Sequence, residues 1–428
     1  MSDELQPGGS QGAPQAEPVL PPRTRSRVAL GLTSAAAVGR FELQECRVCH
    51  AVQYPPREVC HRCLSSSLDW KPQSGVGELI SETRLLHSHH EFFRHRVPIR
   101  LGLVRLESGP TAVAYLHSSV GKAPARVKVA ARLDKAGLGV LVAHTGESGT
   151  ARSAGREDGK PEDRHLEEMS NDPRGRKVLV SDGTTALGAA LIQRLVDAGV
   201  AVVWAGQGAG AAATKDDGDP PIEHRGARVE PPAEFARAGA VQPLALNLAS
   251  DESVIHAAGS IGSQVDIVIN NADVMGSARE QMEAHYFSLV RLSKAFGPPM
   301  RVGGAMAWVN VLSMYALSSL PALEDFSASM AAAYSCSQSL RADLSSAGVR
   351  VVNIFPGPIE GARFSATPVP RLTAAALAGA IVAALQDGVE DVYPGDVAQE
   401  WFTRWRADPK VLEREIASAA STDRRREP

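Results

Sequence analysis

The chain has 428 residues, 44% of them hydrophobic and 22% charged, and at about 150 residues per domain this length predicts two or three folded domains. Its 45 Lys and Arg residues against 48 Asp and Glu residues give a net charge of −3, which excludes the basic excess used for generic binding to nucleic acid. No run of about 18 uncharged apolar residues and no apolar signal-peptide core are present, so we expect a cytoplasmic protein without a membrane segment.

Changes in composition divide the chain into five parts. The first is rich in Pro, Gly and polar residues, and the second has short alternating runs at 78–83, 101–106 and 112–116 that predict a small β domain. The third is charged and rich in Gly and Ser, which is typical of a solvated linker. The predicted parts are a disordered leader (1–27), the β domain (28–145), the linker (146–173), an α/β domain (174–412) and a C-terminal tail (413–428).

The α/β domain is predicted from four uniformly apolar runs that alternate with helical stretches. The runs are KVLV, VDIVINNA, AMAWVNVLS and VRVVNIFPG. Short strands that are apolar throughout indicate a parallel sheet covered by helices on both faces, which is a doubly wound arrangement. The stretch 208–240, rich in Gly, Ala, Asp and Pro, is expected to be a surface insertion in this domain.

Four of the five cysteines lie within eighteen residues, as Cys46, Cys49, Cys60 and Cys63 in the pattern CRVC-x10-CHRC. Two CxxC pairs at this separation supply four thiolates, the ligand set of a closed tetrahedral zinc site, and we predict structural zinc here. Alternatives are buried cysteines without metal, a redox pair and a nucleic-acid-binding ribbon. No βαβ pattern follows either pair, and no basic, aromatic surface accompanies them.

The residues around these cysteines carry a resemblance. Phe41, Gln44, Pro55, Pro56 and Arg57 stand in the patterns F-x-x-Q-x-C-x-x-C and Pro-Pro-Arg, and a Gly-x-Gly at residues 75–77 opens the following strand. Residues 28–145 therefore resemble the zinc-ribbon plus OB-fold proteins that accompany acyl-CoA thiolases. The resemblance implies a zinc ribbon, an OB-fold barrel and a noncatalytic subunit that binds beside a thiolase and helps to hold acyl-CoA.

A histidine-rich segment follows within the β domain. His87, His89, His90 and His95 lie in HSHHEFFRH, close to Arg94 and Arg96. We expect a polar strand edge and loop, because the histidines lack a fixed ligand spacing. A second metal site, an acid/base role and a surface for a partner or a CoA phosphate are the alternatives.

The α/β domain opens with SDGTTALG at residues 181–188, and the order of motifs from Arg176 to about Leu412 resembles the short-chain dehydrogenase/reductase family. That family is a Rossmann fold that moves hydride between NAD(P) and an alcohol or ketone. The fingerprint of that family is T-G-x-x-x-G-[IL]-G, so two of its three glycines are replaced in this chain. Asp182 would repel a pyrophosphate, while Gly183 and Gly188 are left for the turn and packing. Further departures from the family are Gly206 and Gln207 after the second strand, Asn247 near the expected adenine, and Asp273 at the end of the loop Asn270, Asn271, Ala272.

The resemblance also locates the family's catalytic set of Asn, Ser, Tyr and Lys. In that order the positions hold His285, Ser313, Phe326 and Met330, so only the serine is kept. The family's lysine lowers the pKa of the tyrosine phenol from one helical turn away, and no tyrosine of this chain has a lysine four residues later. We therefore predict no catalytic residue, no cofactor-binding residue and no bound NAD(P).

The scaffold of that family is retained. PGPI at 356–359 and long helices around 280–297 and 326–346 are present, and in the family these helices pack against the same pair of a second subunit. The segment from Val392 to Ile416 is also similar to the tail of acyl-CoA-pathway members. Cys336 on the second helix is expected to be a small buried residue.

Three functions remain open from the sequence. The first is a noncatalytic adaptor, cytoplasmic and oligomeric, that binds a thiolase through the zinc-ribbon/OB domain and an active 3-hydroxyacyl-CoA dehydrogenase through the pseudo-dehydrogenase domain. The second is an active NAD(P)-dependent oxidoreductase in which His285 and Ser313 form a non-standard catalytic set. The third is an acyl-CoA-binding protein without partners.

Overall fold

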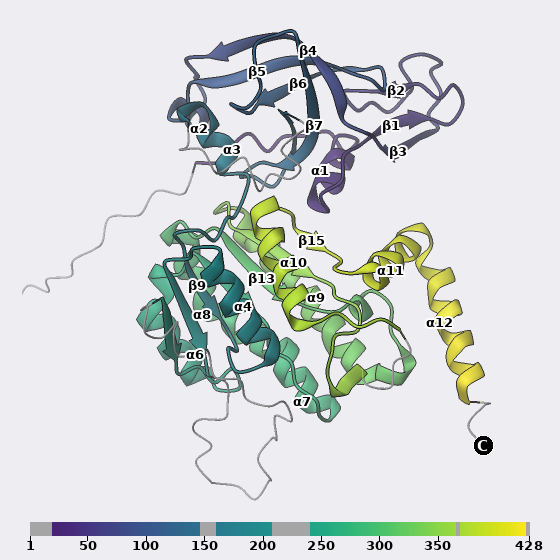
Figure 1. The fold of residues 1–428 in the computed structure, drawn as a ribbon. Helices are drawn as coiled ribbons and strands as arrows, with labels where there is room; N and C mark the ends of the chain where they lie inside the picture. The colour runs from purple at the N-terminus through teal and green to yellow at the C-terminus, as the bar shows by residue number, and fades with distance from the viewer. Residues whose placement is uncertain (1–18, 146–159, 208–239, 365–368, 425–428) are drawn as a thin grey trace, which may run out of the picture.

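The computed structural model describes residues 19–145, 160–207, 240–364 and 369–424 (Figure 1). In Figure 1 a β-rich body built from the N-terminal part stands beside a larger α/β body, as the sequence predicts. The leader expected at 1–27, the insertion expected at 208–240 and half of the predicted linker fall largely outside the described residues. Within the described residues, no helix combines the length and the apolar character needed to cross a bilayer.

The chain first forms a helix and a small antiparallel sheet. Helix α1 (Leu30–Ala37) precedes β1 (Glu42–Cys46), which lies between β2 (Val52–Gln53) and β3 (Leu68–Pro72). The sheet is too short to form a core of its own, and Leu43 of β1 is buried in the core of the adjacent barrel. Of the four clustered cysteines, Cys46 ends β1, and Cys49, Cys60 and Cys63 lie in the turns and loops that connect the strands of this sheet.

A closed five-stranded barrel follows. Its order is β4-β5-β6-β8-β7, with β6 and β8 parallel and the other neighbours antiparallel. Alternate residues such as Leu79, Val104, Leu116 and Val127 point inward and are buried. This is the OB-fold barrel that the resemblance implied, and its strands are β4 (Val76–Leu85), β5 (Ile99–Leu106), β6 (Thr111–Leu116), β7 (Ala125–Leu133) and β8 (Gly139–His144), with the short helix α2 (Glu91–Arg94) between β4 and β5.

The second body is a doubly wound parallel sheet of order β11-β10-β9-β12-β13-β14-β15. Helices α6, α8 and α9 cover one face and α4 and α10 cover the other, and each face has its own buried apolar cluster. The predicted Rossmann architecture is confirmed. The strands are β9 (Lys177–Val180), β10 (Val202–Gly206), β11 (Val241–Leu244), β12 (Ile267–Asn270), β13 (Ala307–Val311), β14 (Arg350–Ile354) and β15 (Asp391–Val392).

The helices of this body include the two long ones that the sequence predicts. The first is interrupted by a π-helical turn, η4 (Glu283–Phe287), and the second is the 22-residue helix α9. The helices are α4 (Ala186–Asp197), α6 (Asp251–Ile261), α7 (Ala278–Met282), α8 (Ser288–Gly303), α9 (Glu324–Ser345), α10 (Ala374–Asp387), α11 (Asp396–Ala407) and α12 (Pro409–Arg424), with short 3-10 turns η1 (Pro161–Asp163), η3 (Gly262–Gln264), η5 (Met314–Ala316), η6 (Pro321–Leu323) and η7 (Ala362–Phe364).

Two expected boundaries differ from the structure. The second half of the predicted linker forms η1 and α3 (Arg164–Glu167), and it buries Asp163 and His165. This segment is ordered because it packs on the barrel: the Ser118 amide donates to the Asp163 carboxylate at 2.9 Å, and the His165 ring lies 4.8 Å from that of Tyr115. The predicted tail begins inside α12, which packs against η6.

The two bodies are joined through buried Arg350 at the start of β14. Its Nη2 donates to the carbonyls of Leu133 and Asp134 in the barrel, at 3.3 and 2.8 Å. Its Nη1 donates to the carbonyls of Met169 and Gly388, at 2.8 and 2.7 Å. One guanidinium thereby satisfies four carbonyls from three segments and connects the barrel to the parallel sheet.

Candidate functional site

The four clustered cysteines come together at the tip of the small sheet. The Sγ atoms of Cys46 and Cys63 are 3.6 Å apart, as are those of Cys49 and Cys60, and all four sulfurs lie within 4.8 Å of one another. Four ligands at the Zn–S distance of about 2.3 Å in a tetrahedron would be separated by about 3.8 Å. The donor set and its spacing therefore fit a structural zinc ion.

The chain folds the same way around each CxxC pair. His50 and Leu64, which follow the two pairs, both have left-handed backbones with φ of 56° and 61°. Their amides donate back to the carbonyls of Cys46 and Cys60, at 2.9 and 3.0 Å. Each pair thus forms a tight knuckle that turns its two sulfurs toward the same point.

Backbone amides also point at the sulfurs. The Val48 amide lies 3.4 Å from Cys46 Sγ and the Arg62 amide 3.4 Å from Cys60 Sγ. Hydrogen bonds from the amides of Cys63 and Arg62 lower the pKa of Cys60 to about 6. The Ser65 amide lowers the pKa of Cys63, but the three neighbouring cysteines outweigh it and raise that pKa to about 12. Four thiolates in this space therefore require a cation, which bound zinc would supply.

The histidine-rich loop has a local structural role. His90 caps α2, its Nδ1 accepting from the Phe92 amide at 3.2 Å, and Arg96 lies 3.8 Å from the centre of the Phe92 ring while pairing with Glu168 at 2.9 Å. Among the described residues, the four cysteines form the one group of three or more side chains suited to hold a metal. The expected polar loop thus agrees with the structure better than the alternative of a second metal site.

In the turn between β9 and α4, side chains of the turn itself accept hydrogen bonds from its backbone amides. The Asp182 carboxylate accepts from the amide and hydroxyl of Thr184, at 2.9 and 2.7 Å. The hydroxyl of Thr185, the N-cap of α4, accepts from the Gly188 amide at 3.0 Å. The amides at a helix N-terminus are the donors that bind a phosphate in nucleotide-binding turns. Here two of these donors are already satisfied.

Asn271 holds this turn in place. Its amide nitrogen donates to the Asp182 carbonyl at 2.7 Å, and its Oδ1 accepts from the Asp182 amide at 3.0 Å. A Cβ on Gly188 would lie 2.1 Å from the same carbonyl oxygen, and one on Gly206 would lie 2.1 Å from the Ser181 oxygen. Both glycines are required by the close approach of two backbone segments, so their presence does not by itself indicate a nucleotide-binding site.

The residues predicted at the catalytic positions are gathered in one region, and all are buried. Phe326 and Met330 lie one turn apart on α9, and both pack into the apolar cluster beneath the sheet. Ser313 Oγ accepts from the Tyr315 amide at 3.2 Å and caps the turn η5. A phenylalanine ring has no proton to transfer and a thioether carries no charge, so the pair that would protonate a substrate carbonyl is absent at these positions.

His285, in the π-helical turn, belongs to a charged cluster. Its Nε2 lies 3.1 Å from Oδ1 of Asp273, and its Nδ1 lies 2.8 Å from Oγ of Ser329. Arg363 of η7 donates to the same Asp273 oxygen at 2.7 Å. Burial raises the pKa of Asp273, but the hydrogen bond from His285 and the charge of Arg363 outweigh it and lower that pKa.

Arg363 closes this cluster. Its guanidinium carbon lies 4.0 Å from the centre of the Phe326 ring, its Nη1 donates to Gln281 at 3.1 Å, and its Nη2 also contacts the Val274 carbonyl. A cation–π contact and an ion pair thus lie beside the residues in the catalytic positions. The sequence predicted Asp273 and His285 as departures from the family, but not that Arg363 joins them.

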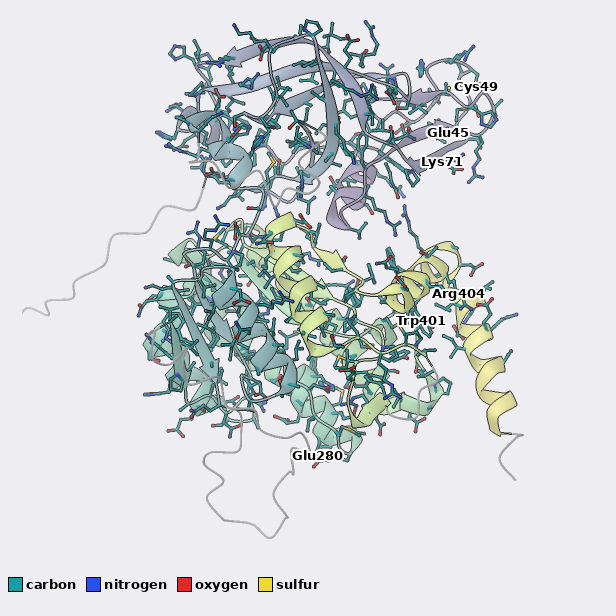
Figure 2. The ribbon with its side chains drawn as sticks, in the orientation of Figure 1. Glu45, Cys49, Lys71, Glu280, Trp401 and Arg404 are labelled. Atoms are coloured by element: carbon teal, nitrogen blue, oxygen red, sulfur yellow. The ribbon has the colours of Figure 1, made fainter. Side chains whose placement is uncertain are left out.

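Aromatic rings fill the space next to Ser313. The Phe364 ring lies 6.2 Å from that of Tyr315 and 6.0 Å from that of Phe326, and the Trp401 ring meets Tyr315 edge-on at 5.5 Å. Burial raises the pKa of Tyr315 to about 12. Trp401, labelled in Figure 2, belongs to α11, a helix that the sequence did not connect with the site.

Comparison with known protein families divides the chain into the same domains as the structure. Residues 33–69 match the family described as ChsH2, rubredoxin-like zinc ribbon domain, and residues 70–135 match ChsH2, C-terminal OB-fold domain. Residues 176–368 match short chain dehydrogenase. The chain is therefore a fusion of a ChsH2-type zinc ribbon and OB-fold with a short-chain dehydrogenase domain.

Individual relatives are oxidoreductases. The chain is 29% identical over 125 residues to the uncharacterized oxidoreductase YusZ of Bacillus subtilis, a match to 26% of this chain and 45% of that protein. It is 29% identical over 213 residues to 1-deoxy-11-beta-hydroxypentalenate dehydrogenase of Streptomyces exfoliatus, covering 46% of this chain and 72% of that protein. The chain thus spans less than half the length of the first of these relatives.

A solved structure is similar as well. It is a short chain dehydrogenase from Burkholderia cenocepacia in complex with NADP, with 28% sequence identity and a TM-score of 0.47. The match covers 57% of this chain and 98% of that one.

Proposed function

We propose that this fusion of a zinc ribbon, an OB-fold and a short-chain dehydrogenase domain is a noncatalytic subunit of an acyl-CoA-processing complex. Its N-terminal domains bind a thiolase, and its dehydrogenase domain pairs with an active 3-hydroxyacyl-CoA dehydrogenase. The subunit would link oxidation of a 3-hydroxyacyl-CoA to thiolytic cleavage of the 3-oxoacyl-CoA. Holding two enzymes together raises the effective concentration of the intermediate that they share.

The observation that carries the proposal is the burial of Phe326 and Met330 where the family has its tyrosine and lysine. Each is less than 5% exposed. Arg363 and Phe364 pack against Phe326: the Arg363 guanidinium carbon lies 4.0 Å and the Phe364 ring centre 6.0 Å from the centre of the Phe326 ring. An apolar, packed side chain thus stands at the position of the family's proton donor, and the nearby charged groups, Arg363 and Asp273, pair with each other.

The turn after β9 supports the absence of a nucleotide. Asp182 places a carboxylate where a pyrophosphate would lie, and it accepts the hydrogen bonds that a phosphate would receive. Asp273 adds a second carboxylate in the region, paired with Arg363. A bound dinucleotide would have to displace both arrangements.

The exposed side chains of α8 and α9 support pairing with a second subunit. The outer side of α9 carries small residues, and the large apolar side chains of Phe287 and Val302 at the two ends of α8 are 44% and 62% exposed. Small side chains let helices approach closely, which suits the helix-to-helix pairing seen in the family. An active dehydrogenase of the same fold would present a matching pair of helices.

The alternative, an active oxidoreductase that uses His285 and Ser313, is opposed by their hydrogen bonds. Both ring nitrogens of His285 are engaged, with Asp273 and Ser329, and Ser313 accepts from the Tyr315 amide. The described contacts therefore do not join the two residues into an acid/base pair. A proton relay through His285 would first need to break its bond to Ser329 or Asp273.

Two measurements test the proposal. Titration of the purified chain with NADH and NADPH, followed by nucleotide fluorescence, should show no binding up to millimolar concentrations, with about one zinc per chain by metal analysis. Coexpression with a thiolase and an active 3-hydroxyacyl-CoA dehydrogenase from the same organism should give one co-eluting complex. Micromolar nucleotide binding would contradict the noncatalytic role, and elution as three separate species would contradict the adaptor role.

A further inference from the structure

Helix α11 lies between the dehydrogenase site and the zinc ribbon. Figure 1 shows it on the side of the α/β body that faces β1 and β3. One side of the helix packs on the site: Ala398 is buried, and the Trp401 ring meets Tyr315, two residues after Ser313, at 5.5 Å and 90°. In this position α11 covers the ring of Tyr315, which lies beside that of Phe364.

The next residue of α11 belongs to an aromatic stack. The Phe402 ring lies 3.8 Å from that of Tyr393 at an interplanar angle of 13°, and Tyr393 lies 5.2 Å from Phe355 at 12°. On the ribbon side, the Arg40 guanidinium is 5.3 Å from the centre of the Phe402 ring. Phe402 therefore contacts both bodies of the molecule.

An ion pair at the end of α11 completes the connection. Arg406 donates through both terminal nitrogens to the two carboxylate oxygens of Glu42, at 3.1 and 2.9 Å, and Arg40 lies 3.7 Å from the same carboxylate. Glu42 is only 2% exposed, so its charge depends on these partners. The hydrogen bond to Glu42 raises the pKa of Arg406.

Glu42 begins the strand that leads to the metal site. Strand β1 runs from Glu42 to Cys46, and Gln44 within it accepts from the Arg57 amide at 2.8 Å and from the Gln53 side chain at 2.9 Å. These bonds tie β1 to the loop before the second cysteine pair. The position of Glu42 therefore follows from the ribbon that surrounds the four sulfurs.

We propose that α11 is a lid over the buried aromatic rings of Tyr315 and Phe364 in the dehydrogenase domain, and that the metal-bound zinc ribbon holds it closed through Glu42. The small sheet has few apolar side chains to bury, so its order depends on the metal that joins its two knuckles. When the metal leaves, β1 loses its fixed position, Glu42 no longer meets Arg406, and α11 loosens. Opening exposes the rings of Tyr315 and Phe364, an apolar surface next to Ser313.

The first test removes the metal from the full chain with a chelator and follows amide hydrogen exchange by mass spectrometry. Exchange in 396–407 should rise at least threefold along with that of the ribbon, whereas α4 and β13, which do not contact the ribbon, should keep their protection. Unchanged protection of 396–407 in the metal-free protein would overturn the proposal.

The second test removes the ion pair between Arg406 and Glu42 while the metal stays bound. Arg406→Gln and Glu42→Gln should each speed exchange in 396–407 about three- to tenfold with zinc content unchanged, because a charge-assisted pair to a buried carboxylate is lost. Arg404→Gln is the matched control: Arg404, labelled in Figure 2, lies on the same helix but pairs with Glu415 and Glu400.

Two results would contradict the lid. One is exchange in the Arg406→Gln protein equal to that of the wild type, and the other is an equal increase in the Arg404→Gln control. Both tests use the isolated chain and need neither a nucleotide nor a partner, so their outcome is independent of the proposed adaptor role.

Discussion

The zinc ribbon and the dehydrogenase domain differ in how much of the functional site of their families they retain. At the ribbon all four cysteines are kept, and their sulfurs lie within 4.8 Å of one another. In the dehydrogenase domain the parallel sheet and its helices are kept, but the tyrosine and lysine positions hold buried Phe326 and Met330. The zinc ribbon retains the four cysteines of its metal site, whereas the dehydrogenase domain retains the sheet and helices of its family but not the tyrosine and lysine side chains.

The difference follows from what each site contributes to the fold. A structural metal supplies folding energy directly, so loss of a ligand would unfold the ribbon. A catalytic residue commonly costs stability, because a charged or polar group is held in a partly buried place, and its replacement by an apolar one improves packing. The chain therefore shows a metal site that the fold requires beside a reaction site that the fold does not.

The largest effect is expected from the loss of one metal ligand in the zinc ribbon. Cys60→Ser should reduce the zinc content from about one per chain to near zero and abolish the protection of ribbon amides, because a closed tetrahedral site loses one of four ligands. Metal analysis and hydrogen exchange measure both effects. Cys336→Ser, a change to a half-buried cysteine on α9, is the control and should keep its zinc. Full zinc in Cys60→Ser would show that the site does not need all four sulfurs.

The next test restores the family's catalytic pair. The double variant Phe326→Tyr/Met330→Lys should lose about 4 kcal/mol of stability at pH 7, because the new amine must stay neutral or be charged in a buried place. It should still not reduce NAD(P) with a 3-hydroxyacyl-CoA, since Arg363, Asp273 and the turn after β9 are unchanged. Urea unfolding followed by tryptophan fluorescence and an assay of NAD(P)H formation measure the two outcomes.

Phe326→Tyr alone is the control for this variant, and it should cost much less stability because it adds no charge. Activity in the double variant above that of the wild type would mean that the domain lost its chemistry at two positions only. In that case the contrast between the two regions would be far smaller than the structure indicates.

A third test asks whether the charged cluster of Asp273, His285 and Arg363 contributes to stability. The pKa of Asp273 is lowered in the folded state, so its contribution is present above the ordinary carboxyl pKa of about 3.9 and is lost as pH falls through the lowered value. Asp273→Asn should be about 1–2 kcal/mol less stable than the wild type at pH 6, a modest figure because the carboxylate is 39% exposed.

This difference should shrink at pH 3. Urea midpoints of both proteins at the two pH values measure it, and zinc loss in acid affects both proteins alike. A difference that is equal at the two pH values would show that the Asp273 charge does not act through Arg363 and His285.

The smallest expected effect concerns the turn after β9. Thr185→Ala should destabilise the chain by about 1 kcal/mol, the usual cost of removing an N-cap hydroxyl, and, if the proposed function holds, should not create nucleotide binding. Thr185→Ser keeps the hydroxyl and is the control, read by the same urea midpoints. If Thr185→Ala instead changed nucleotide affinity, the turn would still take part in binding a cofactor.

Much of this organisation could be predicted from local sequence. The CxxC spacing specified the four metal ligands, because two cysteines three residues apart in a tight turn present their side chains together. Uniformly apolar strands such as VRVVNI predicted the parallel sheet, since strands covered on both faces cannot alternate. The resemblance to the dehydrogenase family located Phe326 and Met330, which lie one helical turn apart and so share a face of α9.

Other features depend on contacts between distant segments. Arg363 lies 90 residues from Asp273, and no local pattern connects a loop after β14 with one after β12. The ordered half of the linker packs on the barrel through Asp163, and α11 meets the zinc ribbon through the bond from Arg406 to Glu42.

The sequence by itself determined the metal ligands, the two architectures and the positions where catalytic groups are replaced, because each depends on spacing within a single element or turn. Only the tertiary structure decided that Arg363 closes the cluster of Asp273 and His285, and that Arg350 and Arg406 join the two bodies. The physical reason is that an arginine side chain has five hydrogen-bond donors, which can bind many different carboxylates and carbonyls. Which of these acceptors it binds depends on the tertiary fold, because the fold decides which acceptor lies within reach.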